Sequence, residues 1–390
     1  MHISILRELA PGESRVALLP EAVRGLVSKG LEVAAEAGSG AAAGASDEDY
    51  RQAGANVTSD RHQLLASADV LPVVNTPAAH DLRQLKSGAV MIGFLRPLDS
   101  PSSLDPAIER GATLFAMELV PRITRAQAMD ALSSMATVAG YKAALLAADR
   151  LPKMFPLLMT AAGTIAPAHV LVLGAGVAGL QAIATSRRLG AVVNAYDVRA
   201  VAGEQVRSLG AKFLEVDLGG IETEDKGGYA KELSEEALAR GRELIAANAR
   251  TSDVVITTAQ VPGKRAPRML SRAAVEAMRP GSVIVDLAAP AGGNCELTRP
   301  GEEVVHNGVT ILGPLNLPAT VPVHASQLYS RNVNNFLQLL VKNYTPADAN
   351  TAFAGDPVGL NLDWNDEIIR GSCVAHEGEL MNERISAKAA

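Results

Sequence analysis

Short runs of apolar residues, separated by amphipathic segments, fill the first third of the chain. The runs predicted to be strands are ISIL (3–6), LEVAAE (31–36), ADVLPVV (68–74), AVMIGF (89–94) and ATLFAM (112–117). Residues 20–29 predict a helix, because a proline opens an amphipathic stretch there. Strands that alternate with helices are typical of a parallel sheet covered on both faces. The first third therefore predicts one α/β domain.

A second series of the same kind begins at His169. Its predicted strands are HVLVLG (169–174), AVVNAYD (191–197), KFLEV (212–216), DVVITT (253–258) and SVIVDLA (282–288). Helices are predicted over 177–189 and 231–249, and the glycine-rich, charged segment 217–228 predicts a mobile surface loop. We therefore expect a second α/β domain of the Rossmann type.

Between the two series, residues 125–150 are rich in alanine and other strong helix formers. At about 1.5 Å per residue, one helix over this segment would be long enough to bridge two domains. A helix over 332–342 would return the chain to the first domain, and a pair of strands is expected around 368–374. The predicted architecture is two doubly wound, Rossmann-like α/β domains with a cleft between them. The first combines 1–125 with 320–390, and the second spans 126–319 and includes the linking helix.

One stretch without charged side chains, from Met154 to Ser186, is longer than the ~20 residues of a membrane helix. Pro156 and Pro167 interrupt its first half, and glycines interrupt its second. The pattern predicts a strand, a turn and a helix, each buried in protein, rather than a membrane span. The N-terminus also lacks the basic start and long apolar run of a signal peptide.

Composition narrows the possible functions further. The 390 residues are 48% hydrophobic, which supplies two cores, and the formal net charge of -6 comes without a basic stripe. Binding to nucleic acid is therefore not expected. Cys295 and Cys373 are too few and too far apart for a disulfide framework, and no histidine has a partner at metal-ligand spacing. We expect no metal site.

The motif with the clearest chemistry is Gly174-Ala-Gly176-Val-Ala-Gly179, which directly follows a predicted strand and opens a predicted helix. Gly174 would make the tight turn, Gly176 would let the backbone approach a pyrophosphate, and Gly179 would pack the helix against the strand. The helix N-terminus would present its N–H groups to the phosphates. The motif predicts a dinucleotide site, and a glycine turn without a ligand is the less favoured alternative.

The next predicted strand ends in Asp197, about 20 residues beyond the turn, where an acidic residue accepts hydrogen bonds from the adenosine ribose. A carboxylate there would repel a 2′-phosphate, which favours NAD(H) over NADP(H). Arg199 partly opposes this preference, because an arginine nearby can accommodate that phosphate.

The segment 121–134 has two interpretations. Thr124 and Gln127 fit a capping box, and Asp130 would favour the helix dipole, so a structural role explains all three. Their expected place beside the cleft favours a functional role instead.

These segments resemble a known family. PRITRAQAMDALSS (121–134), TAAGTIAPAHVLVLGAGVAGLQAIATSRRLGA (160–191), GGYAKE (227–232) and SVIVDLA…GGNCE closely resemble the NAD(H)-binding component of proton-translocating nicotinamide nucleotide transhydrogenase. RELAPGESRVALLPE (7–21) is similar to the N-terminus that this component shares with alanine dehydrogenase. The resemblance extends to about Lys342 and is weaker in the tail.

The resemblance implies a role for each matching residue. The nicotinamide end of the cofactor would be held by Arg122, Gln127, Asp130 and Ser133, the last through the carboxamide. The rest of the nucleotide would contact the glycine turn with Val177, Ala178 and Gly179, the ribose group Asp197, Val198 and Arg199, the closing loop with Gly228 and Tyr229, and Gln260.

The resemblance also implies an activity and partners. Hydride would pass between NAD(H) on this chain and NADP(H) on a partner subunit, coupled to proton translocation in a membrane-spanning subunit. The chain would be a homodimer, cytoplasmic, and peripherally attached to the inner membrane through the complex.

Two other functions remain open. Alanine dehydrogenase is similar at Arg15, but Asn75 stands about where it has a lysine and Arg96 about where it has a histidine. Without a base near pH 7, oxidation of an amine lacks its proton acceptor, whereas exchange between two nicotinamides needs none. A non-catalytic NAD-binding module is the second alternative. The turn Gly292-Gly293-Asn294-Cys295 is interpreted as one that holds the fold rather than as a nucleotide loop.

Overall fold

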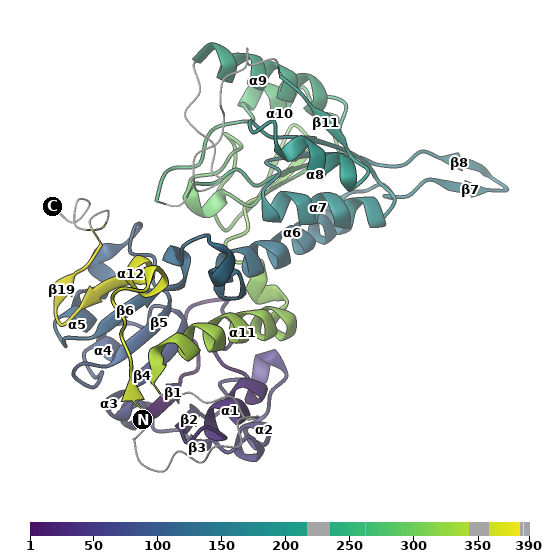
Figure 1. Cartoon of the computed structure of the whole chain (residues 1–390). Helices are drawn as coiled ribbons and strands as arrows, with labels where there is room; N and C mark the ends of the chain where they lie inside the picture. The colour runs from purple at the N-terminus through teal and green to yellow at the C-terminus, as the bar shows by residue number, and fades with distance from the viewer. Residues whose placement is uncertain (217–234, 262, 343–358, 383–384, 386–390) are drawn as a thin grey trace. The chain divides into compact units, whose positions relative to one another are not determined.

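The computed structural model describes residues 1–216, 235–261, 263–342, 359–382 and 385 (Figure 1). The chain forms two compact units. Unit 1 comprises 1–135 and 319–390, and unit 2 comprises 136–318. Residues 126–135, which the sequence assigned to the second domain, lie in unit 1.

The sheet of unit 1 has eight strands in the described part of the chain, in the order β19-β18-β6-β5-β4-β1-β2-β3. The strands are β1 (His2–Ile5), β2 (Glu32–Glu36), β3 (Asn56–Thr58), β4 (Val70–Asn75), β5 (Val90–Phe94), β6 (Thr113–Ala116), β18 (Cys373–His376) and β19 (Glu379–Leu380). The α-helices are α1 (Pro20–Val27), α2 (Asp47–Gln52), α3 (Arg61–Ser67), α4 (Ala79–Leu82), α5 (Asp105–Ile108), α11 (Pro322–Leu340) and α12 (Glu367–Ser372). Strands β1 to β6 are parallel to their neighbours, and β18 joins β6 antiparallel.

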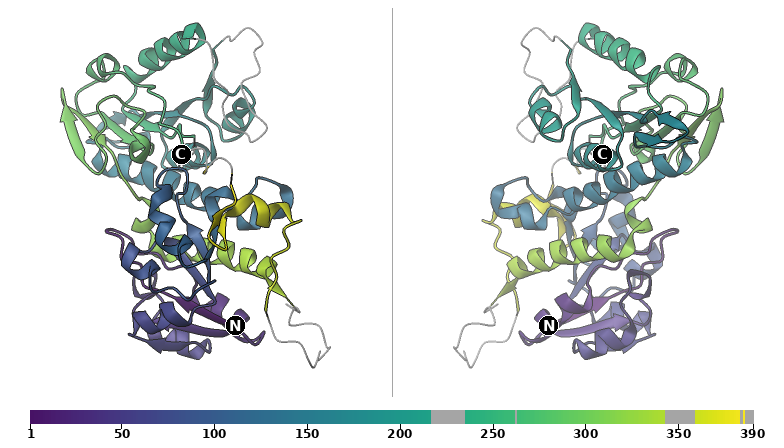
Figure 2. Two further views of the ribbon diagram at one scale, coloured as in Figure 1. Left: turned by 90° about the vertical axis from the view of Figure 1, so that its left-hand side faces the viewer. Right: turned by 90° about the vertical axis from the view of Figure 1, so that its right-hand side faces the viewer.

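Helix α11 covers one face of this sheet with residues that come late in the chain (Figures 1 and 2). Tyr329 donates a hydrogen bond of 2.7 Å to the carbonyl of Val73 in β4. The ring of Phe336 meets that of Phe115 in β6 edge-on, with centroids 5.3 Å apart. The C-terminal part of the chain therefore completes the core of unit 1.

Unit 2 holds a seven-stranded sheet in the order β11-β10-β9-β12-β13-β15-β14. Its strands are β9 (His169–Leu173), β10 (Val192–Tyr196), β11 (Lys212–Leu214), β12 (Val254–Thr257), β13 (Val283–Asp286), β14 (Glu303–His306) and β15 (Val309–Leu312). Its described α-helices are α7 (Val177–Arg188), α8 (Ala202–Ser208), α9 (Glu235–Ala249) and α10 (Arg272–Glu276), and α6 (Ala131–Arg150) begins in unit 1 and ends in unit 2. In both sheets the chain runs outward from a first strand, then returns to its other side. The prediction of two Rossmann-like, doubly wound domains is confirmed.

The strands of unit 2 are apolar on both faces because each face has its own helical cover. In β9, Val170 and Val172 point into a core shared with α6, α7 and α8. Leu171 and Leu173, one position along, point into the opposite core with α9 and α10. This is the alternation that a buried parallel strand requires.

The predicted helix over 125–150 begins later than expected. Residues Thr124–Met129 form a 3-10 helix (η4) without a side-chain cap, so the predicted capping box of Thr124 and Gln127 is wrong. Asp130 instead accepts hydrogen bonds from the N–H and the hydroxyl of Ser133, at 2.8 and 2.6 Å. A carboxylate in this position stabilises the start of a helix, so α6 starts at Ala131.

Among the described residues, α6 is also the one helix long and apolar enough to span a membrane by length and composition alone. Such a test is weak evidence, because core helices of globular proteins pass it too. Ala143, Ala144 and Ala147 of α6 are fully buried in the core of unit 2, which accounts for its apolar composition.

Two further predictions need correction. The stretch 154–186, predicted to be buried throughout, contains an exposed hairpin of β7 (Leu158–Thr160) and β8 (Gly163–Ile165), whose backbone groups pair with each other. The strand pair expected around 368–374 is α12 followed by β18, because Asp366 caps a helix by accepting the N–H of Ile368 at 2.8 Å.

Candidate functional site

The sheet of unit 2 changes direction between β9 and β12, and in open α/β sheets ligands bind at this point beyond the carboxyl ends of the strands. The glycine turn occupies it. Gly174 has φ +95°, a conformation that favours glycine, and its N–H donates to the carbonyl of Tyr196 at 2.8 Å. A Cβ on Gly179 would lie 1.8 Å from the carbonyl oxygen of Gly174. The turn and the helix thus fit together only without that side chain.

Gly176 has a different reason to be glycine. Its backbone is extended at the N-cap of α7, and no atom lies within 4 Å of the Cβ that it lacks. Local sterics therefore permit a side chain there. The space beside it adjoins the start of α7, which has no side-chain cap and carries the positive end of the helix dipole. Val177 is exposed and Ala178 partly exposed at this end, an arrangement suited to an anion.

The long helix supports this turn from within unit 2. A Cβ on Gly140 of α6 would lie 2.0 Å from the carbonyl oxygen of Ala178. Gly140 therefore lets α6 press directly against the first turn of α7. The sequence carries one signal for this, an isolated glycine inside a strong helical pattern, which we did not interpret.

Asp197 follows β10 and lies beside the glycine turn. Its carboxylate accepts the N–H of Ala175 at 2.7 Å and binds the guanidinium of Arg199 through Nε and Nη2, both at 3.0 Å. The structure thus brings the acid, the arginine and the turn together. The negative charge that would face a ribose is partly neutralised, while its hydrogen-bonding oxygens stay at the edge of the turn. Val198, between the two, is partly exposed.

Thr258 completes this edge from the strand on the other side, and the sequence analysis missed it. Its hydroxyl donates to the carbonyl of Gly174 at 3.0 Å. Gln260, two residues further, is exposed. Gly228 and Tyr229 lie outside the described residues.

The four residues expected at the nicotinamide belong to unit 1, on the segment that leads into α6. Arg122 and Gln127 are exposed, and Asp130 and Ser133 are partly exposed and hydrogen-bonded to each other. The segment is held by α11, whose Asn332 donates to the carbonyl of Ala128 at 2.9 Å. The structure therefore supports this part of the chain firmly and leaves two of its polar side chains accessible.

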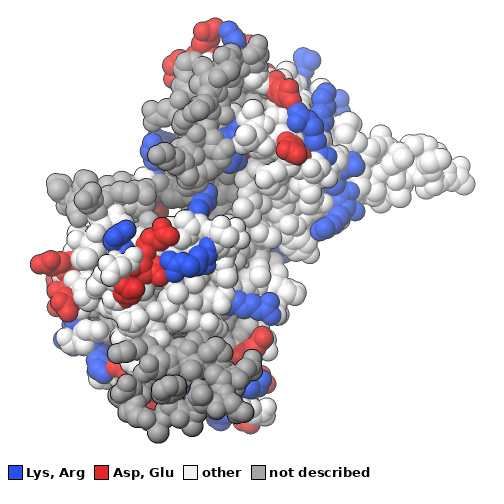
Figure 3. All heavy atoms as spheres, viewed as in Figure 1, with Lys and Arg blue, Asp and Glu red and all other residues white. Residues whose placement is uncertain are grey.

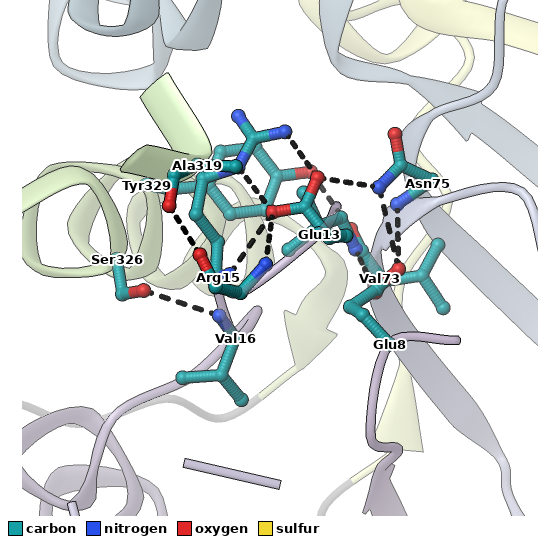
Figure 4. Close-up of polar contacts among 11 residues, drawn as sticks. Glu8, Glu13, Arg15, Val16, Val73, Asn75, Ala319, Ser326 and Tyr329 are labelled. Carbon is teal, nitrogen blue, oxygen red and sulfur yellow. Dashed lines mark hydrogen bonds and ion pairs between the residues drawn. The ribbon is translucent and has the colours of Figure 1, made fainter. Parts of the chain in front are cut away.

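The corresponding edge of unit 1, between β1 and β4, is filled by its own side chains (Figure 4). Glu13 binds Arg15 through both carboxylate oxygens, at 2.7 and 2.6 Å. The Asn75 amide donates to Glu13 at 2.9 Å. Glu13 and Arg15 are 1% and 6% exposed, so this arginine is buried against a carboxylate of its own chain.

Buried carboxyls at this edge have shifted pKa values. Burial acts to raise the pKa of Glu13, but the hydrogen bonds and charge of Arg15 outweigh it and lower the pKa to about 2. Burial raises the pKa of Glu8 to about 7, although its carboxylate accepts the N–H groups of Val74 and Asn75. Glu118 shows the same shift, to about 7, also from burial.

Arg96, at the position where alanine dehydrogenase was expected to have a histidine, is exposed, and its N–H donates to Glu118 at 2.5 Å. Among the described residues no group of His, Cys, Asp and Glu side chains is arranged to hold a metal ion.

Comparison with known proteins decides the family. The model of the alanine dehydrogenase/PNT N-terminal domain matches residues 4–139, and that of the C-terminal domain matches 143–383. The chain belongs to the alanine dehydrogenase/PNT family.

Within this family, the chain is 43% identical to an NAD(P) transhydrogenase alpha subunit of Rhodospirillum rubrum, with both chains covered completely. The solved transhydrogenase of Sinorhizobium meliloti is 38% identical, with a TM-score of 0.82 over 98% of this chain and 99% of that one. The alanine dehydrogenase of Mycobacterium tuberculosis is 31% identical over 99% of this chain and 96% of its own. The resemblance to the NAD(H)-binding transhydrogenase component that the motifs indicated is confirmed.

Proposed function

We propose that this member of the alanine dehydrogenase/PNT family is the NAD(H)-binding peripheral subunit of a Re/Si-specific, proton-translocating transhydrogenase. The observation that carries the proposal is the glycine turn of unit 2. It lies at the switch point of a doubly wound sheet, with an uncapped helix start and Asp197 beside it. The identity of 43% to a transhydrogenase alpha subunit over the whole chain supports the same activity.

The residues of unit 2 fit NAD(H). Gly176 leaves room for a pyrophosphate beside the start of α7, where Val177, Ala178 and Gly179 present their backbone. The carboxylate of Asp197 is placed to accept ribose hydroxyls, with Arg199 and Val198 around it. When bound, the nicotinamide supplies the hydride that is transferred.

The chain's own part in that reaction is to hold and orient the ring. We assign this role to Arg122, Gln127, Asp130 and Ser133. Because Asp130 fixes Ser133 and starts α6, a change there would disturb both the backbone and the ring contact. Arg122 and Gln127 are exposed, so their substitution tests the ring contact with less structural cost.

The partners follow from the activity. NADP(H) would be held on a second subunit, and proton translocation would take place in a membrane-spanning subunit that attaches this chain to the cytoplasmic face of the inner membrane. We also propose a homodimer. The hairpin β7–β8 projects from unit 2, and its surface carries no charged side chain (Figure 3). Met159 is 78% exposed and Ile165 43% exposed, which a second copy would cover.

The test mixes the purified chain with an NADP(H)-binding transhydrogenase component and follows the reduction of an NAD analogue by NADPH. Arg122→Ala and Gln127→Ala should lose turnover. Arg125→Ala is the matched control, because this exposed arginine lies on the same segment but pairs with Asp366. Activity without the partner on alanine and NAD would instead establish an amino-acid dehydrogenase. Nucleotide binding without turnover in either assay would establish a non-catalytic module.

A further inference from the structure

The loop that follows β13 is tied to the end of β12 through one buried amide. Asn294 is fully buried. Its Oδ1 accepts the N–H of Ala259 at 3.0 Å, and its Nδ2 donates to the carbonyl of the same residue at 2.8 Å. The side chain therefore binds both backbone groups of one residue, as a residue of a neighbouring strand would. Nδ2 also donates to the carbonyl of Pro267 at 2.8 Å.

Ala259 lies directly across from the glycine turn. The preceding residue, Thr258, donates through its hydroxyl to the carbonyl of Gly174, and its N–H donates to Leu173 at 2.8 Å. The next residue, Gln260, is exposed. The backbone that Asn294 holds is thus one wall of the switch point, with the turn as the other.

The same loop is anchored a second time, by a contact that does not reach Ala259. The buried carboxylate of Asp286 accepts the N–H of Cys295 at 3.0 Å and the hydroxyl of Thr298 at 2.7 Å. Loss of the Thr298 bond would loosen the loop without removing the amide from Ala259. The two contacts can therefore be separated by substitution.

We propose that Asn294 is a positioning residue for the nucleotide, which fixes the Thr258–Gln260 wall at the distance from the glycine turn that NAD(H) requires. The inference rests on the proposed function and adds a residue to the site. Without the amide, Ala259 loses both of its side-chain bonds, and the wall is held by Thr258 alone. Nucleotide affinity should fall while the residues that orient the ring stay in place.

The experiment measures the Kd of NADH by fluorescence titration of the full chain, at a temperature where every variant is folded. Asn294→Ala should raise the Kd by about tenfold, equivalent to about 1.4 kcal/mol. With the partner component present, the KM for NAD(H) should rise and kcat should be retained. Thr298→Val, the matched control, should lower the melting temperature but leave the Kd unchanged.

Asn294→Asp adds a readout that a purely structural role would not produce. A protonated carboxyl carries one donor and one acceptor, the same pair that Ala259 meets now, whereas a carboxylate carries acceptors only. The NAD⁺ affinity of Asn294→Asp, measured by calorimetry, should therefore approach that of the parent as the pH falls from 8 to 5.5. The affinity of Asn294→Ala should show the same pH dependence as the parent.

A Kd for Asn294→Ala within twofold of the parent would overturn the inference, and so would an equal loss of affinity in Thr298→Val. A parent chain that binds no NADH would overturn the proposed function together with this inference. Tight binding by the parent and by Asn294→Ala would overturn the inference alone.

Discussion

Two glycines of the turn, Gly176 and Gly179, should respond in opposite ways to the same substitution by alanine. In Gly179→Ala the new methyl group would lie 1.8 Å from the carbonyl oxygen of Gly174, and 3.2 Å from the hydroxyl of Thr258. An ordinary contact is about 3.5 Å, so the turn or the helix must move by more than 1 Å. Overpacking of this kind costs about 1–3 kcal/mol. For a unit of this size that lowers the melting temperature by roughly 2–12 °C.

In Gly176→Ala the methyl group would meet no atom within 4 Å, and the backbone there already suits alanine. The melting temperature should stay within about 2 °C of the parent, because such surface changes alter stability by roughly 0.5 kcal/mol or less. The methyl group would instead occupy the space proposed for the pyrophosphate. The Kd of NADH should rise by about tenfold or more.

Thermal unfolding of each variant, with and without saturating NADH, distinguishes the two effects. Ligand at 100 times its Kd stabilises the folded state by about 2.7 kcal/mol, so Gly176→Ala should lose much of the shift that NADH gives the parent. An unchanged melting temperature in Gly179→Ala would refute the packing argument. An unchanged NADH affinity in Gly176→Ala would refute the assigned pyrophosphate position.

Other predictions test the charges and the exposed hairpin. The folded pKa of Glu8, about 7, exceeds its unfolded value of 4.5, so the folded state binds the proton more tightly. Stability should fall by up to ~3 kcal/mol as pH rises from 4.5 to 7, and urea unfolding of Glu8→Gln should show a smaller fall. The pKa of Glu13 is lowered to about 2, so its contribution should be present above pH 4.5 and disappear as pH falls to 2. Asp197→Ala removes the negative charge beside Arg199, so the ratio of NADPH to NADH affinity, measured by titration, should rise; a constant ratio contradicts the specificity argument. Met159→Glu places a charge on the exposed hairpin, and light scattering should show a smaller assembly than the parent if this hairpin joins two copies.

Much of the fold could be predicted from the sequence because its strands are apolar on both faces and alternate with helices. The order of the strands and the place of the glycine turn follow from that pattern. Helix starts were less predictable, because more than one polar residue near residue 124 can cap a helix. Asp130 does so through Ser133, and Thr124 does not.

The supporting contacts of the site could not be read from the sequence. Gly140 and Asn294 act on residues that are distant in the chain, Ala178 and Ala259, and no local spacing connects them. Arg15 illustrates the same limit, since its burial against Glu13 depends on how the loop after β1 folds back on itself.

The division of unit 1 into two stretches of chain affects its synthesis. The side chains that cover β4 and β6, Tyr329 and Phe336, leave the ribosome about 200 residues after the strands themselves. At roughly 5–20 residues per second this interval lasts ~10–40 s. Residues 136–318 are continuous and can fold within it. The nucleotide-binding unit therefore matures first, while the apolar face of the N-terminal sheet waits uncovered and depends on chaperones to keep it from aggregating.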